Sequence, residues 1–397
     1  MPVQRADVVV LGAGVAGAAV AYHLARRHVG SVVALEARTP AAGATGRAAG
    51  IVSEQLWDRW DVEAVRASKE EYAALAARLA PGAYRVNGFV RWTANERIAR
   101  ALDQRSQELR SWGVEVRDLD ASGLGRLLPA GRTDDLRAIA YAPGDAVVAP
   151  STLAEAYVAE GRRLGVDWRF GSPVTSLRRN GEAWDVPCRG TSFRAPQLVV
   201  AAGAWSKGVL AAAKAPLPLA PYRTQAAVLD RPGGFPGDGP SFHDLDVDVY
   251  GRPEENGRLL AGDGTERVEA DPETFVPTGD PEFIEHLADA VERRLPGWTD
   301  ATLVRAWAGV CVATPDRRPL IGPVPTAPGL HVLTGFNGFG VMRAAGAAQQ
   351  LAELLAVGGA AAEERLASVS PARFPPGSPA FAPRPGFTLQ AGVDPEF

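Results

Sequence analysis

The sequence predicts an α/β fold with two domains, one built on a parallel sheet and one on a mainly antiparallel sheet. Val8–Leu11 and Val32–Leu35 are short apolar runs separated by a helix-forming stretch, the pattern of a buried β-α-β unit. A similar run recurs at Gln197–Val200. Between residues 216 and 270, alternating segments are separated by Pro and Gly, which is typical of antiparallel strands.

The first apolar run leads into a glycine-rich turn. Gly12, Gly14 and Gly17 form G-x-G-x-x-G, whose glycines permit a tight turn, close approach of a pyrophosphate, and close helix–strand packing. Ala16–Arg27 is Ala-rich and predicts a helix whose N-terminus attracts an anion. Glu36 lies 19 residues after Gly17, near the spacing for binding an adenosine ribose. These features predict a dinucleotide site. The alternative, a glycine-rich turn in an ordinary β-α-β unit, would explain the glycines but not an acidic residue at the end of the second strand.

Composition narrows the class of protein. The chain has 397 residues and a net charge of −4, which gives no basis for binding nucleic acid or an anionic membrane. Cys188 and Cys311 are its two cysteines, so we expect no disulfide framework, and no metal-ligand spacing is present. No apolar stretch reaches about 18 residues. We therefore expect a cytoplasmic protein. Almost all basic residues are Arg, which favours a bacterial source.

The segment 37–52 is rich in Gly and Ala, so its backbone could lie flat against a planar ligand. The alternative interpretation is a flexible surface loop. Ser151 is the expected N-cap of its helix, and Asn180-Gly181 predicts a hairpin between 174–178 and 183–186. The Pro-rich segment 375–397 predicts an extended or disordered tail. The other predicted helices cover 62–79, 96–112, 118–128, 151–164, 283–295 and 341–355, and the other strands cover 84–92, 138–142, 166–170, 302–307 and 331–334.

Residues 242–250 alternate in character, which predicts one strand with Asp244, Asp246 and Asp248 on one face. That face is either solvated or an acidic wall that attracts a cationic amine. His243, on the opposite face, is expected to be structural. His23 and His28, on the first helix, are expected at the surface.

From residues 3 to 360, the whole pattern resembles the FAD-dependent oxidoreductases of the D-amino-acid oxidase, glycine oxidase and sarcosine oxidase superfamily. Five segments in this order carry the resemblance. They are the glycine motif with Glu36, residues 43–50, residues 199–205, residues 307–309 leading to 314–322, and residues 335–340.

The resemblance implies a Rossmann-like FAD-binding domain and an α+β substrate domain. The FAD-binding domain would comprise residues 1–83, 143–215 and 300–365. The substrate domain would comprise residues 84–142 and 216–299, and residues 366–397 would form the Pro-rich tail.

The resemblance also implies roles for single residues. Arg38 would continue the phosphate and flavin contacts, the backbone of Val174 would meet the adenine, and Ala202-Gly203 would close over the diphosphate. The helix N-terminus at 338–341 would stabilise negative charge on the reduced flavin. The complete set of cofactor-binding candidates is Gly12, Ala13, Gly14, Val15, Ala16, Gly17, Glu36, Ala37, Arg38, Ala44, Thr45, Arg47, Ala48, Ala49, Gly50, Ile51, Val174, Ala202, Gly203, Trp205, Gly309, Gly338, Phe339, Gly340, Val341 and Met342.

The chain departs from the family where relatives bind a substrate carboxylate. The Arg that follows Trp-Ala-Gly in glycine and D-amino-acid oxidases is matched by Cys311. A second Arg of glycine oxidase falls near Gly338, and a Lys of monomeric sarcosine oxidase falls near Met342. Arg343 and Arg223 are the substitutes we consider, because Arg is the natural carboxylate clamp.

The catalytic candidates are Tyr250, Arg343, Phe339, Trp307 and Cys311. Tyr250 matches a family position that touches substrate. Monomeric sarcosine oxidase tethers its flavin through a Cys near this segment, but Cys311 is offset by two residues, so we favour non-covalent FAD over a covalent link.

The expected reaction is oxidation of a C–N bond in a small-molecule amine or amino acid. Hydride transfer to flavin N5 would give an imine, and O₂ or another acceptor would then take the electrons. Two alternatives remain open at this point: oxidation of a 2-hydroxy acid or other alcohol, which a His over the flavin would favour, and a flavin-bearing subunit of an electron-transfer complex.

Overall fold

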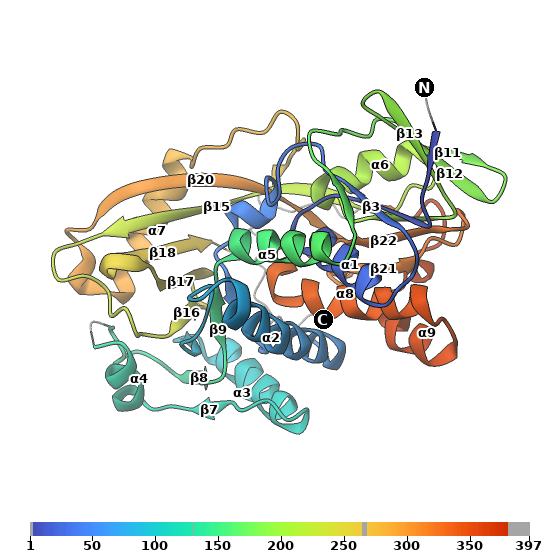
Figure 1. The fold of residues 1–397 in the computed structure, drawn as a ribbon. Helices are drawn as coiled ribbons and strands as arrows, with labels where there is room; N and C mark the ends of the chain where they lie inside the picture. The colour runs from blue at the N-terminus through green and yellow to red at the C-terminus, as the bar shows by residue number, and fades with distance from the viewer. Residues whose placement is uncertain (1–2, 130, 264–267, 380–397) are drawn as a thin grey trace.

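The computed structural model describes residues 3–129, 131–263 and 268–379, and Figure 1 shows their arrangement. Two large sheets organise the chain, one with helices packed on it and one extending from it through the long strands β15 and β20. The greater part of the predicted Pro-rich tail, residues 380–397, lies outside the described residues.

The six-stranded sheet is parallel except for its last strand. Its order is β10 (Asp167–Arg169), β3 (Val32–Leu35), β2 (Val8–Leu11), β14 (Gln197–Val200), β22 (Leu330–Thr334) and β21 (Leu320–Pro323). β21 pairs antiparallel with β22. Strands from four separate parts of the chain therefore meet in one sheet, which confirms the predicted α/β class and its assembly from several segments.

Both faces of this sheet are covered, which is why its strands are continuous apolar runs. Val8 and Val10 face one core with the helices, and Val9 and Leu11 face the other. The helical layer contains α1 (Val15–Arg26), α2 (Arg59–Leu79), α5 (Pro150–Arg163) and α8 (Gly340–Ala356). The opposite layer contains α6 (Ser206–Ala212) and the sheet β1 (Val3–Arg5), β13 (Thr191–Ala195), β12 (Ala183–Cys188) and β11 (Arg178–Asn180).

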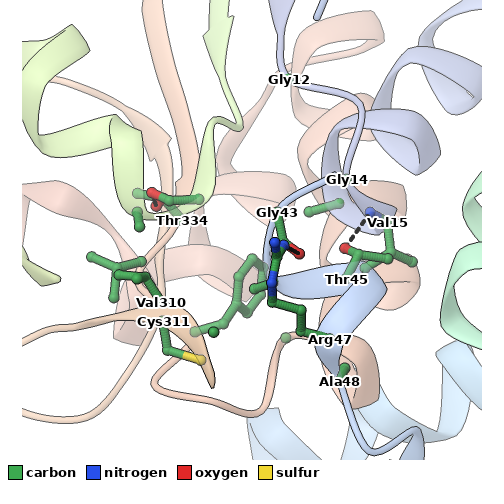
Figure 2. Close-up of a pocket in the computed structure, with 18 of the residues that line it drawn as sticks. Gly12, Gly14, Val15, Gly43, Thr45, Arg47, Ala48, Val310, Cys311 and Thr334 are labelled. Atoms are coloured by element: carbon green, nitrogen blue, oxygen red, sulfur yellow. Dashed lines mark hydrogen bonds between the residues drawn. The ribbon is translucent and has the colours of Figure 1, made fainter. Parts of the chain in front are cut away.

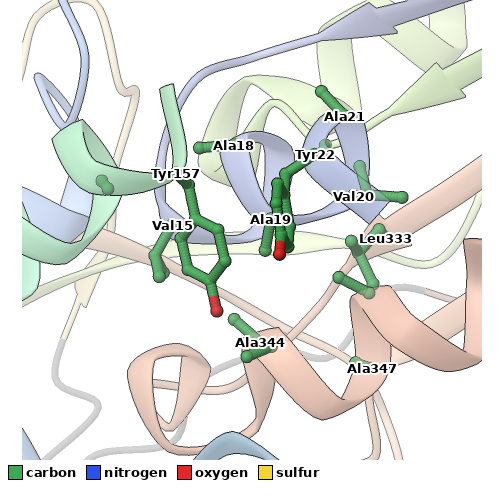
Figure 3. Close-up of a cluster of buried hydrophobic side chains, with 14 of the residues drawn as sticks. Val15, Ala18, Ala19, Val20, Ala21, Tyr22, Tyr157, Leu333, Ala344 and Ala347 are labelled. Carbon is green, nitrogen blue, oxygen red and sulfur yellow. The ribbon is translucent and has the colours of Figure 1, made fainter. Parts of the chain in front are cut away.

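Small side chains let the helices approach one another closely. Figure 3 shows Ala18 and Ala19 of α1 beside Tyr157 of α5, with Ala344 of α8 below them. A β-carbon at Gly346 of α8 would lie 2.3 Å from the carbonyl oxygen of Ala64 in α2. This close packing fixes the N-termini of α1 and α8, both of which point toward the carboxyl edge of the sheet.

The second large sheet is mainly antiparallel. Its order is β19 (Val268–Glu269), β15 (Ala220–Asp230), β18 (Leu259–Asp263), β17 (Val249–Pro253), β16 (Ser241–Asp244), β6 (Phe89–Thr93), β8 (Ala138–Ala142) and β7 (Arg117–Asp118), with β20 (Thr302–Ala313) on the other side of β15. Only β16 and β6 pair in parallel in this sheet, as far as the structure describes it. Helices α3 (Glu96–Ser111), α4 (Ala121–Leu127) and α7 (Pro281–Arg294) accompany this sheet.

A small sheet, β4 (Ile51–Val52), β9 (Ala146–Val148) and β5 (Tyr84–Val86), lies between the two. α9 (Ala360–Leu366) follows α8. Short 3-10 turns occur at Ala44–Arg47, Gly203–Trp205, Glu255–Gly257, Pro296–Trp298, Ala367–Val369 and Pro371–Arg373. The hairpin at Asn180-Gly181 is confirmed, with Gly181 at φ +62°, but its first strand begins at Arg178, not Val174.

Two predicted single strands are each divided in the structure. The strand expected over 84–92 breaks at Gly88, whose φ is +75°, and yields β5 and β6. The strand expected over 242–250 is a hairpin, β16 and β17, whose turn includes Asp248 at φ +52°. Ser151 is not the N-cap of α5, because Pro150 is the first helical residue and Ala149 precedes it.

Candidate active site

A cavity of about 790 Å³ runs between the two large sheets. At one end it is lined by Glu36, Arg38 and residues 172–175, and along its middle by the glycine turn after β2. At the other end the N-terminus of α8 faces strands of the antiparallel sheet. Figure 2 shows the central part, with Gly14, Val15 and Gly43 on one side and Val310 and Cys311 across from them.

Two glycines of the motif, Gly12 and Gly17, leave no room for a side chain. Gly12 has φ +108°, and a β-carbon there would lie 2.5 Å from the carbonyl oxygen of Ala201. A β-carbon at Gly17 would lie 2.1 Å from the carbonyl oxygen of Gly12. Gly17 therefore permits helix–strand packing behind the cavity, whereas Gly14 lies on its wall.

Glu36 and Thr45 hold this turn in place. The Glu36 carboxylate accepts hydrogen bonds from the backbone N–H groups of Ala13 and Arg38, both at 2.8 Å. The Thr45 hydroxyl accepts one from the Val15 N–H at 3.0 Å, shown as the dashed line in Figure 2. The N-cap residue of α1 is Gly14, which has no side chain to cap the N–H groups that follow Val15, so the helix N-terminus keeps a partial positive charge that suits a phosphate.

Arg47 joins the Gly-rich segment to β20. Its guanidinium donates to the carbonyls of Ala42 and Gly43, at 2.6 and 3.2 Å. Its own carbonyl accepts a hydrogen bond from the Trp307 indole at 3.0 Å. A β-carbon at Gly309 would lie 3.2 Å from the Arg47 side chain, so the missing side chain lets Arg47 lie against β20.

The N-terminus of α8 is positioned by a buried asparagine. Asn337, at φ +53° and fully buried, accepts a hydrogen bond from the Thr314 N–H at 3.0 Å and donates to the Thr314 hydroxyl and the Gly335 carbonyl. Gly338 follows at φ +82°. No side chain caps α8, so its first N–H groups face the cavity with their partial positive charge.

Residues of the antiparallel sheet form what we call the cross-strand row, which faces the same cavity. Each member pairs with the next on the neighbouring strand, and directly paired residues share one face of a sheet. In order, the row is Arg91, His243, Tyr250, Gly262, Ala226 and Trp307. All except Gly262 line the cavity. A β-carbon at Gly262 would lie 2.4 Å from the Tyr250 hydroxyl, so Gly262 makes room for the Tyr250 ring.

The row carries buried charged and polar groups. His243 Nε2 lies 2.7 Å from Asp248 Oδ1, and both residues are buried. Burial, followed by the negative charge of Asp263, raises the pKa of the Tyr250 hydroxyl well above its usual range. Burial lowers the pKa of Arg91 to about 10, against an opposing effect of Asp145, and the guanidinium therefore stays charged near neutral pH.

Arg91 and His243 are the main lining residues that the sequence did not single out for the site. Arg91 is the one charged residue inside the apolar run 89–92. This isolated charge is the sequence feature that could have identified Arg91 as a candidate site residue. His243 comes into contact with Asp248 only through the turn between β16 and β17. The predicted acidic face does not exist: Asp244 pairs with Arg294 at 3.0 Å, Asp246 accepts from the Ala94 N–H at 2.7 Å, and Asp248 pairs with His243.

Neither substitute anchor considered from the sequence lies on the cavity wall. Arg343 is fully buried, pairs with Asp61, and donates to the Phe336 carbonyl at 2.6 Å. Arg223 pairs with Asp280 and donates to the Val276 carbonyl at 3.0 Å. Both arginines therefore have structural partners, and neither is positioned as a carboxylate anchor.

Most of the other predicted residues do line the cavity. Tyr250, Phe339, Trp307 and Cys311 are among them, whereas Ala13 and Gly17 lie behind the wall. The predicted cofactor residues on the wall are Gly12, Gly14, Val15, Ala16, Glu36, Ala37, Arg38, Ala44, Thr45, Arg47, Ala48, Ala49, Gly50, Ile51, Val174, Ala202, Gly203, Trp205, Gly309, Gly338, Phe339, Gly340, Val341 and Met342.

These features fit an extended dinucleotide cofactor. The cavity has a carboxylate at one end, an uncapped helix N-terminus beside a glycine turn in the middle, and a second uncapped helix N-terminus near the other end. Among the described residues, no cluster of His, Cys, Asp and Glu could hold a metal ion. In the same residues, none of the helices is long and apolar enough to cross a membrane.

Comparison with known proteins agrees with this fit. The family described as DAO, FAD dependent oxidoreductase, matches residues 7–354. The mitochondrial dimethylglycine dehydrogenase of Rattus norvegicus is 27% identical over 383 residues. The alignment covers 88% of this chain and 43% of that relative, so the chain spans less than half of its length.

Two solved structures share the fold over almost their full length. L-proline dehydrogenase from P. horikoshii matches with a TM-score of 0.85 and 21% identity, covering 94% of this chain and 98% of that one. Iminodiacetate oxidase from Chelativorans sp. BNC1 matches with a TM-score of 0.80 and 25% identity, covering 92% and 99%.

Proposed function

The chain belongs to the family of FAD-dependent oxidoreductases, and on that premise we propose that it oxidises a C–N bond of an amine or amino acid to an imine. One observation carries the proposal: the cross-strand row and the N-terminus of α8 line the same cavity. A substrate on the row would lie against a cofactor held at α8. The relatives named for dimethylglycine, proline and iminodiacetate are similar in sequence or fold.

The residues divide into cofactor-holding and substrate-facing groups. Glu36 would bind the adenosine ribose, and the N-terminus of α1 would bind the pyrophosphate. Bound FAD supplies the chemistry, because its flavin accepts a hydride at N5. The N-terminus of α8 would stabilise the negative charge of the reduced form. We propose non-covalent binding, with Cys311 as a wall residue.

The substrate side would position the amine and exclude water. Trp307, Phe336 and Phe339 give the cavity apolar walls, which favour a neutral amine over its ammonium form. A neutral amine needs no protein base to release hydride from its α-carbon. Tyr250 stays protonated at neutral pH, because its pKa is raised, and it would donate a hydrogen bond rather than accept a proton.

A panel of substrates tests this proposal. Holoprotein is mixed anaerobically with primary, secondary and cyclic amines and amino acids while the visible spectrum is recorded. Loss of the oxidised flavin spectrum with an amine would support the proposal, and readmitted air would separate an oxidase from a dehydrogenase. A flavin that stays oxidised with every amine would reject it.

Oxidation of a 2-hydroxy acid is the second candidate function. The specific observation in its favour is the buried His243–Asp248 pair on the cavity wall, because alcohol oxidation needs a base and a carboxylate-oriented His is a suitable one. Hydroxy acids in the same panel distinguish the two. Loss of the oxidised flavin spectrum with a hydroxy acid, but with no amine, would favour this second function.

Other features of the protein remain proposals. We propose a bacterial, cytoplasmic protein on the basis of its arginine-rich composition, although the similar dehydrogenase from rat is mitochondrial. We also propose domain boundaries near residues 83, 142, 215, 299 and 365.

A further inference from the structure

Residues 270–280, which we call the strap, connect β19 to α7 and are tied to the antiparallel sheet near both ends. The Ala270 N–H donates a hydrogen bond to the Pro221 carbonyl of β15 at 3.0 Å. The Pro277 carbonyl accepts a hydrogen bond from the Ala308 N–H of β20 at 2.8 Å. The two long strands of the sheet therefore anchor the strap.

Between these anchors the strap forms a tight turn. The Phe275 N–H donates to the Asp271 carbonyl at 3.0 Å, and the Glu273 N–H donates to the Asp271 carboxylate at 2.9 Å. The second bond is the local side-chain-to-backbone contact by which Asp favours turns. The turn thus holds its own shape, and Glu273 and Phe275 are free to contact other parts of the molecule.

Glu273 contacts the cofactor side of the cavity. Its carboxylate accepts a hydrogen bond from the Trp205 indole N–H and lies 3.6 Å from the Arg38 guanidinium. The guanidinium carbon of Arg38 lies 5.4 Å from the centre of the Trp205 ring. All three residues line the cavity. Trp205 and Arg38 follow strands of the parallel sheet, so this contact joins two walls of the cavity that belong to different sheets.

Phe275 makes a second contact with the cofactor side. The guanidinium carbon of Arg47, which also lines the cavity, lies 5.8 Å from the centre of the Phe275 ring. A β-carbon at Gly43 would lie 3.2 Å from the Trp205 ring, so the missing side chain leaves room for Trp205 next to the Gly-rich segment. One turn of the strap therefore touches two of the loops that form the cofactor wall.

The tip of the strap is held less firmly than its ends. The side chains of Glu273 and Arg38 are 62% and 50% exposed, and exposed ion pairs contribute little to the stability of a fold. The strap can therefore detach from the cofactor wall while its ends stay on the sheet. A dinucleotide that extends from Glu36 to the N-terminus of α8 would be enclosed by the strap as long as Glu273 keeps its contacts.

We propose that Glu273 is a clasp residue, which holds the strap closed over the bound dinucleotide and thereby slows its release. This inference rests on the FAD-binding part of the proposed function. A carboxylate on the wall is a poor partner for a pyrophosphate, because like charges repel. Its contacts with Trp205 and Arg38 give it a role that does not depend on touching the phosphates.

The rate at which the holoprotein releases FAD tests this inference without turnover. Holoprotein is diluted, and the rise in flavin fluorescence gives the dissociation rate constant. We expect Glu273→Ala to release FAD about tenfold faster, because it removes a charge-assisted hydrogen bond, which is stronger than a neutral one, from an exposed site. Glu273→Gln keeps an acceptor for the indole but loses the charge, and its rate should lie between the two.

The matched control is Glu269→Ala. Glu269 immediately precedes the strap, lies 3.1 Å from the Lys207 ammonium and is exposed, and it lies outside the described cavity wall. Its substitution removes the same charge from the same region of the molecule and should leave the release rate at the wild-type value.

Release from Glu273→Ala at the wild-type rate would overturn the inference. Slower release would also overturn it, because the carboxylate would then repel the cofactor rather than retain it. Equal acceleration by Glu269→Ala would do the same. The amine panel is independent of these rates. If release depends on Glu273 but no amine reduces the flavin, the clasp stands and C–N oxidation fails; if an amine reduces the flavin and release does not depend on Glu273, the reverse holds.

Discussion

Gly14 illustrates how much a single residue contributes to the site. It lies on the cavity wall at the N-terminus of α1, where a β-carbon would lie 3.1 Å from the Thr45 hydroxyl. Gly14→Glu would place a carboxylate where a pyrophosphate is expected. Because an unpaired charge in such a site costs several kcal/mol, we expect FAD affinity to fall at least about tenfold, measured as flavin absorbance per protein.

The matched control is Gly237→Glu, which adds the same charge to an exposed glycine with open space around its β-carbon. It should retain full flavin. Gly14→Glu protein that also retained full flavin would refute the assignment of the glycine motif.

Arg343 is a residue whose role we expect to be structural. It is fully buried and pairs with Asp61, whose pKa is raised by burial against the opposing effect of Arg343. Removing one partner leaves a buried charge uncompensated, so Arg343→Met should lower the free energy of unfolding by about 3–5 kcal/mol. Denaturant unfolding measures this change.

A double variant separates charge from packing. Arg343→Met with Asp61→Leu should recover most of the lost stability, because replacing both ions with apolar side chains is close to neutral. If the single variant were as stable as wild type but lost substrate affinity, Arg343 would be an anchor after all.

At the scale of elements, four helices of the parallel-sheet layer meet at one carboxylate. Glu71 of α2 lies 2.9 Å from His23 of α1 and accepts a hydrogen bond from Tyr157 of α5 at 2.7 Å. Gln349 of α8 also donates to it. His23 is 2% exposed, contrary to the surface position expected for it, because α1 is covered by α2, α5 and α8.

This cluster predicts a pH dependence of stability. Burial raises the pKa of Glu71, but the hydrogen bonds from His23, Tyr157 and Gln349 outweigh burial, so the net pKa lies below its ordinary value of 4.5. The ionised carboxylate therefore stabilises the fold above about pH 4.5, and this contribution is lost as the pH falls through the lowered pKa.

Glu71→Gln should cost about 2 kcal/mol at neutral pH, and the difference in thermal stability from wild type should shrink below pH 4. Thermal unfolding from pH 3 to pH 8 measures both. A difference that stayed constant over this range would contradict the role given to the ionised carboxylate.

The antiparallel sheet shows where local patterns fail. Residues 242–250 alternate as one strand would, but Asp248 adopts φ +52° and the chain reverses. This reversal makes His243 and Tyr250 neighbours and brings Asp248 back to His243. Alternation alone does not reveal such a turn, because Asp is tolerated both in a strand and in the left-handed conformation.

At the scale of the whole molecule, the cavity wall around the glycine motif was predictable from the sequence, whereas the wall formed by the antiparallel sheet was predictable only in part. Gly12, Gly14 and Glu36 follow the two strands of one β-α-β unit. Their spacing in the chain therefore determines their spacing in the fold. Arg91, His243 and Trp307 come from three distant parts of the chain and meet through strand register. Register across six strands cannot be read from one sequence, and for this reason the sequence did not reveal that Arg91 lines the cavity.

The effect of deuterium in the substrate on the rate of flavin reduction tests the central claim most directly. The amine that reduces the flavin best is compared with the same amine deuterated on the carbon next to nitrogen, by rapid anaerobic mixing with holoprotein. We predict complete reduction, slowed severalfold by deuterium, because hydride leaves that carbon. Reduction at the same rate with both compounds would contradict rate-limiting C–H cleavage at that carbon, and reduction by hydroxy acids but by no amine would contradict C–N oxidation itself.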